Sequence, residues 1–80
     1  MENKIAIIGI IVKGNNSSAE CINSVLHDYS QYIIGRLGLP YRTKGVYIIS
    51  IALDAPQSMI EEIVDKIEEL ENVNAKTLYA

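Results

Sequence analysis

A chain of 80 residues and 8.9 kDa has room for one small domain, which we expect to span residues 1–80. Its 49% hydrophobic content excludes an intrinsically disordered chain, and its single cysteine excludes an internal disulfide and fits the reducing cytoplasm. The formal net charge of −3 disfavours direct contact with nucleic acid, and no apolar run approaches the roughly 20 residues of a membrane-spanning helix.

Two nearly continuous apolar runs of strand length occupy residues 4–12 and 46–53. Both are rich in β-branched residues and lack proline, which is typical of central strands buried on both faces. A chain this short can supply helices for one face of a sheet and has nothing left for the other. We therefore expect a second copy to cover the other face, in a homodimer or homotetramer.

The segment after the first run is a turn followed by a helix. Residues 13–18 are turn formers, and apolar side chains then recur at helical spacing over residues 18–30. The positions on this apolar side are Ala19, Ile22, Val25, Leu26 and Tyr29. Residues 32–39 predict a strand that is weakened by two glycines and ended by Pro40, as suits the edge of a sheet, and residues 41–45 predict a polar hairpin connection.

A second helix is predicted after the run 46–53, with Asp54 as its N-cap and Pro56 in its first turn. A clean apolar stripe lies opposite an acidic face, and Asn72 or a neighbour closes the helix. The stripe consists of Ile60, Ile63, Val64, Ile67 and Leu70. Residues 73–79 predict a final short strand.

The predicted order is therefore βαββαβ. Right-handed crossovers place both helices on one face of a four-stranded antiparallel sheet with strand order 4-1-3-2. This is the ferredoxin-like arrangement of the α+β class. In this order the first and third strands are central, in agreement with their apolar sequences.

The sequence shows no catalytic arrangement and no metal site. Cys21 and His27 lie six residues apart on the first predicted helix, so their side chains diverge by about 120° and cannot share an ion. We expect Cys21 to be a small, partly buried residue and His27 to be solvated. The acidic residues fit the solvated face of the second helix, so we expect neither an enzyme nor a cofactor.

Two features point to an anionic ligand. The connection after the first strand leads into a helix N-terminus, where free backbone N–H groups favour anions, and this makes Gly14 and Asn15 candidate ligand-binding residues. The same residues are also the ordinary choice for a turn without a ligand. The second feature is the pair of arginines Arg36 and Arg42. A guanidinium suits bidentate recognition of a carboxylate, so Arg36 is the first candidate for binding such a ligand and Arg42 is the second.

Several motifs resemble a small bacterial family named as iron-only hydrogenase system regulators. They are Leu26-His27-x-Tyr29-Ser30, Ile33-x-x-Arg36-x-Gly38-x-Pro40, Val46-x-Ile48-Ile49 and Ile67-x-x-Leu70-x-x-Val73-x-Ala75-Lys76-Thr77. The resemblance implies an ACT-like ferredoxin fold, related in shape to the carboxy-terminal domain of the nickel-responsive repressor, and a role in regulation. No ligand role for Arg36, Gly38 or Pro40 follows from it.

The repressor domain binds nickel through several histidines and a cysteine, whereas this chain has one of each, on diverging helix faces. We therefore do not expect its metal function here, and we find no segment suited to a ribbon-helix-helix DNA-binding arm. The expected function is a small non-catalytic regulatory module that senses a small anionic molecule or docks on a partner protein. The alternatives are a transcriptional regulator that acts through a separate DNA-binding protein, and a structural assembly unit without a ligand.

Overall fold

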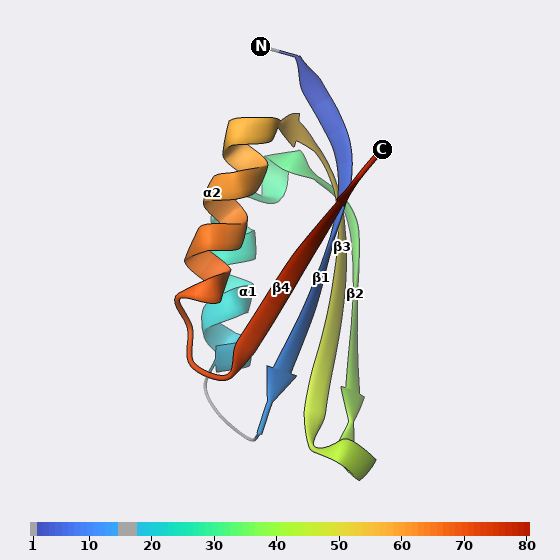
Figure 1. Cartoon of the computed structure of the whole chain (residues 1–80), viewed down its shortest axis with the longest axis vertical. Helices are drawn as coiled ribbons and strands as arrows, with labels where there is room; N and C mark the ends of the chain where they lie inside the picture. Colours follow the sequence, from blue (N-terminus) through green and yellow to red (C-terminus); the bar gives the residue numbers. More distant parts are fainter. Residues whose placement is uncertain (1, 15–17) are drawn as a thin grey trace.

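The computed structural model describes residues 2–14 and 18–80, which form a four-stranded antiparallel sheet with both helices on one face (Figure 1). Its elements are β1 (Asn3–Lys13), α1 (Ser18–Asp28), a 3-10 turn (Ser30–Tyr32), β2 (Ile33–Tyr41), a second 3-10 turn (Arg42–Lys44), β3 (Val46–Pro56), α2 (Gln57–Glu68) and β4 (Val73–Tyr79). Within these described residues, neither helix has the length and apolar composition needed to cross a membrane.

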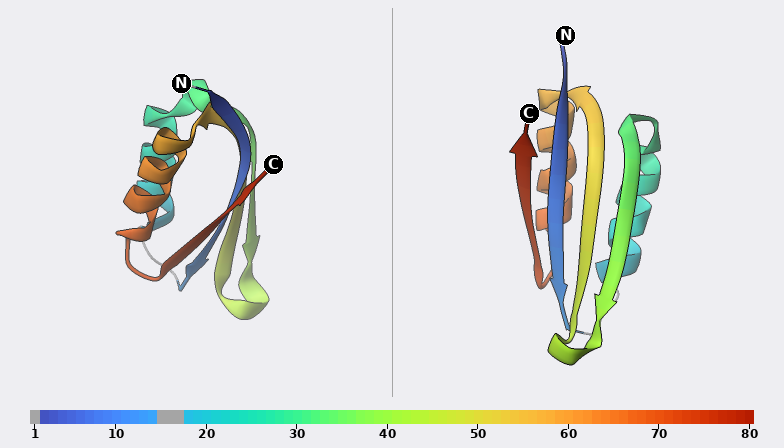
Figure 2. Two further views of the ribbon diagram at one scale, coloured as in Figure 1. Left: turned by 45° about the horizontal axis from the view of Figure 1, so that its top comes forward. Right: turned by 90° about the vertical axis from the view of Figure 1, so that its right-hand side faces the viewer.

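The strands lie in the order β2-β3-β1-β4, as predicted, and Figure 2 shows them side by side with the helices behind. The predicted α+β, ferredoxin-like βαββαβ fold is therefore confirmed. β1 and β3 are the central strands and pair along their whole length, from Asn3 opposite Pro56 to Lys13 opposite Val46.

The core lies between the helices and the sheet. Alternate residues of the central strands point into it, because successive side chains of a strand face opposite sides. On β1 these are Ala6, Ile8, Ile10 and Val12, and on β3 they are Ile49, Ile51, Leu53 and Ala55. The helices contribute Ile22, Leu26, Ile60, Ile63 and Ile67, so the predicted apolar stripes are confirmed.

Several predicted boundaries are wrong. The first helix is predicted to run to residue 30, whereas α1 ends at Asp28, and the second is predicted to close near Asn72, whereas α2 ends at Glu68. Asp54 is not an N-cap: it stays in β3 opposite Ile5, and α2 begins only after Pro56, which occupies the N-cap position without a side-chain cap. The reason is that the ladder with β1 continues through Pro56 and holds Asp54 in extended backbone. Pro40 does not end β2 either, because β2 is an edge strand, where a residue without an N–H is tolerated while it pairs with Tyr47.

Candidate functional site

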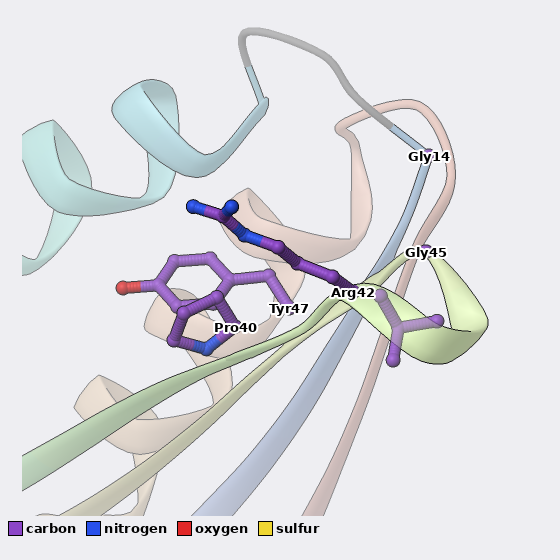
Figure 3. A pocket seen from close by; sticks show the side chains of 6 residues that line it. Gly14, Pro40, Arg42, Gly45 and Tyr47 are labelled. Carbon is purple, nitrogen blue, oxygen red and sulfur yellow. The ribbon is translucent and has the colours of Figure 1, made fainter.

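A pocket of about 450 Å³ opens where the β2–β3 hairpin meets the end of β1 (Figure 3). The residues that line it are Gly14, Pro40, Arg42, Gly45, Val46 and Tyr47. The backbone N–H of Gly14 donates to the carbonyl oxygen of Gly45 at 2.9 Å, which joins the two chain segments. Both glycines have positive φ, 82° and 64°, so an L side chain at either position would be strained.

Arg42 supplies the positive charge of this pocket. Its exposed side chain extends in the same direction as the phenol of Tyr47 (Figure 3). Among the described residues no hydrogen bond or ion pair holds its guanidinium. The ring of Pro40 adds an apolar wall, and the lining contains no carboxylate. The arrangement can therefore accept a small anion that also carries an apolar part.

The Tyr47 ring rests on Gly38 of β2. A Cβ atom at Gly38 would lie 2.6 Å from the Tyr47 hydroxyl oxygen and 3.2 Å from its Cζ. The absence of a side chain at Gly38 therefore allows the phenol to lie flat along the sheet, where it forms part of the pocket. The physical role of this glycine is the space it leaves above β2.

Arg36 lies away from the pocket. Its Nη2 donates to Oδ1 of Asn23 on α1 at 2.5 Å, so it connects the edge strand to the helix. Of the predicted ligand residues, the structure brings Gly14 and Arg42 together and places Arg36 elsewhere, while Asn15 lies outside the described residues. Tyr47 and Gly45 were missed by sequence reasoning. The register of β1 with β3, which sets Lys13 opposite Val46, is the signal that would have found them.

Cys21 was expected to be partly buried, and this prediction is wrong. α1 turns Ile22 and Leu26 into the core, which leaves the thiol of Cys21 and the ring of His27 exposed to solvent. Within the described parts of the chain, no three His, Cys, Asp or Glu side chains converge in a metal-binding group.

A polar cluster joins the end of α1 to α2. The Tyr29 hydroxyl donates to Oε2 of Glu62 at 2.6 Å, and Nζ of Lys66 lies 5.1 Å from the centre of the Tyr29 ring. Hydrogen bonding to Tyr29 raises the pKa of Lys66 above its usual 10.5, and the carboxylates of Glu62 and Asp28 act in the same direction. All these groups are engaged with one another, which indicates a structural role.

The sheet surface opposite the helices, called the open face below, is largely apolar. Its large side chains are between 38% and 67% exposed: Ile5, Ile7, Ile11, Leu37, Leu39, Tyr41, Ile48 and Leu78. Eight large apolar side chains that are each more than a third exposed thus share one face of the sheet, which marks an interaction surface rather than the scattered apolar residues of an ordinary monomer surface. β1 and β3 are thus apolar on both faces, as predicted. Within a single chain, however, only the face that packs against the helices is covered.

This combination of two helices, one four-stranded sheet and βαββαβ order is the fold of ACT domains. The crystal structure of the ACT domain from GTP pyrophosphokinase of Chlorobium tepidum matches with a TM-score of 0.81 and 15% identity, over 95% of this chain and 99% of that one. A formyltetrahydrofolate deformylase from Pseudomonas putida KT2440 matches with a TM-score of 0.66 and 10% identity, over 92% of this chain and 28% of that one.

The chain belongs to the TM1266-like family, described as "Iron-only hydrogenase system regulator, putative", whose model matches residues 4–77. This confirms the resemblance inferred from the motifs. The structure of the uncharacterized protein TM1266 from Thermotoga maritima matches with a TM-score of 0.93 and 27% identity, over 98% of each chain. A comparison with curated proteins finds no match.

Proposed function

We propose that the chain is a non-catalytic regulatory module of an iron-only hydrogenase system, which works as a homo-oligomer and senses a small anionic molecule at the Arg42 pocket. The observation that carries the proposal is the guanidinium of Arg42, which has no partner among the described residues and stands at the mouth of a partly apolar pocket. Membership of a family of regulators supports the regulatory role.

The chemistry of the pocket defines the class of ligand. A guanidinium pairs best with a carboxylate or phosphate, which can accept two parallel hydrogen bonds. The rings of Pro40 and Tyr47 offer contact to a small apolar group attached to that anion. We therefore propose a small organic acid or phosphate ester as the ligand.

A thermal-shift screen of small carboxylates and phosphate esters tests the proposal. A ligand that prefers the folded state must raise the melting temperature, by an amount that grows with its concentration. Arg42→Gln should abolish the shift and leave the melting temperature of the free protein within about 1 °C, because an exposed arginine contributes little to stability.

Arg36→Gln is the matched control, because it removes the same charge from the same hairpin but outside the pocket. It should keep the ligand-induced shift. A shift that survives Arg42→Gln and disappears in Arg36→Gln would move the site to Arg36 and contradict the Arg42 pocket.

A second candidate is a structural assembly unit without a ligand, and the apolar open face favours it. The same screen separates the two functions. An oligomer whose melting temperature no anion in the screen raises would support the assembly unit and contradict the sensor.

A further inference from the structure

The strand register determines where the surface of the open face is raised and where it is hollow. One row of residues across the sheet is Lys76, Gly9, Ser50 and Leu37, and the next row is Asn74, Ile11, Ile48 and Leu39. The small residues in the middle of the first row leave a hollow of about 340 Å³, at whose rim Ile11 and Ile48 stand. A Cβ atom placed on Gly9 meets no atom within 4 Å.

We propose that a second copy of the chain covers the open face and inserts its Ile11–Ile48 ridge into this hollow, so that two copies form a two-fold interface. This inference rests on the homo-oligomer proposed above and adds the face and the register of contact. The exposed apolar side chains of the open face come from all four strands, so they offer a surface broad enough for a standard interface, which buries about 800 Å² on each partner.

The shape of the face is self-complementary, which a two-fold interface requires. Ridge and hollow are adjacent rows, so a two-fold axis that runs across the strands between them places Ile11 of each copy over the partner's Gly9. The same axis places Ile48 over the partner's Ser50. A two-fold axis parallel to the strands would instead set hollow against hollow and leave an unfilled space, which close-packed interfaces avoid.

The polar ends of the two rows agree with this axis. Asn74 and Lys76 both lie on β4 at the edge of the sheet. The axis across the strands brings the ammonium of Lys76 over the partner's Asn74, whose amide oxygen can accept a hydrogen bond. The charge then stays at the solvated rim of the interface, and the isoleucines of the ridge face the small residues Gly9 and Ser50 of the partner copy.

Sedimentation of a dilution series tests the interface, and Gly9→Val is the decisive variant. A Cβ atom at Gly9 meets nothing within 4 Å and points into the open hollow, and valine favours a strand, so the melting curve should keep its cooperativity. The added carbons fill the hollow and exclude the ridge, so the dissociation constant should rise by at least about tenfold, since each substitution occurs twice in the dimer.

Ile11→Ala should weaken association by a similar factor, because it removes the ridge and leaves a void. The double variant Gly9→Val with Ile11→Ala moves three carbons from ridge to hollow and restores the total volume. It should therefore associate more tightly than either single variant. Ile34→Ala is the matched control, because this isoleucine is 63% exposed at the bulge of β2, outside both rows, and its dissociation constant should stay within about threefold of wild type.

The outcomes separate the inference from the function on which it rests. A wild-type chain that is monomeric at low micromolar concentration would contradict both the homo-oligomer and its interface. An oligomer that tolerates Gly9→Val and Ile11→Ala as well as it tolerates Ile34→Ala keeps the homo-oligomer and overturns this interface. Additive effects in the double variant would show that Gly9 and Ile11 do not meet across it.

Discussion

The contact between Gly38 and the phenol of Tyr47 predicts a measurable loss of stability in Gly38→Ala. The new methyl group would lie 2.6 Å from the Tyr47 hydroxyl oxygen, well inside the ~3.5–4.0 Å of a favourable contact, so the ring must move. Overpacking of this kind costs about 1–3 kcal/mol, and the stiffer unfolded chain of an alanine variant offsets ~0.4–1 kcal/mol. Because the hydroxyl end of the side chain can move, we expect a net destabilisation of about 1 kcal/mol.

Urea denaturation at one fixed protein concentration, in wild-type and Tyr47→Ala backgrounds, measures the effect. Without the Tyr47 ring the clash is gone, and Gly38→Ala should then stabilise the protein by about 0.5 kcal/mol. Gly35→Ala is the control on the same strand, because its Cβ meets nothing within 4 Å, and it should be neutral or slightly stabilising. Neither glycine has positive φ, so alanine fits both backbones.

The reversal of sign is the critical result. If Gly38→Ala is as harmless as Gly35→Ala, or equally costly in both backgrounds, Tyr47 does not pack on Gly38 and the wall of the Arg42 pocket is not built as described. A second readout follows from the same movement. The displaced phenol should also weaken any anion binding that depends on Arg42.

Tyr29→Phe removes the hydrogen bond to Glu62 and should cost about 1 kcal/mol in urea denaturation, and an unchanged midpoint would show that this bond contributes nothing. The raised pKa of Lys66 means that protonation favours the folded state, so this stability is complete below pH 10.5 and is lost above the raised pKa. The wild-type melting temperature should therefore fall more steeply at alkaline pH than that of Lys66→Met, and parallel curves would contradict this. Arg36→Ala breaks an exposed hydrogen bond to Asn23 and should change the free energy of unfolding by less than about 0.5 kcal/mol, with the oligomer retained on light scattering. Elemental analysis should find far less than one transition metal ion per purified chain, and a stoichiometric ion would imply a site shared between copies.

Local sequence pattern was enough to predict the strands, the helices and their order. The spacing of Ile60, Ile63 and Ile67 marks one side of a helix, and the apolar runs of β1 and β3 mark central strands, because burial repeats with the geometry of each element. Handedness and short connections then leave few ways to assemble the elements. The family motifs, which span most of the chain, indicated the same fold independently.

The sequence by itself also determined that both faces of the central strands are apolar, since every residue of a strand faces one side or the other. Tertiary structure decided which positions meet. Arg42 and Gly14 line one pocket only because β1 and β3 are antiparallel and in a register that brings the end of β1 to the β2–β3 turn, and Arg36 donates to Asn23 because the edge strand β2 passes beside α1. Pairing with β1 likewise kept Asp54 in a strand against its preference as a cap. Local pattern shows which side of an element is buried, whereas contacts between distant residues depend on the register and position of whole elements.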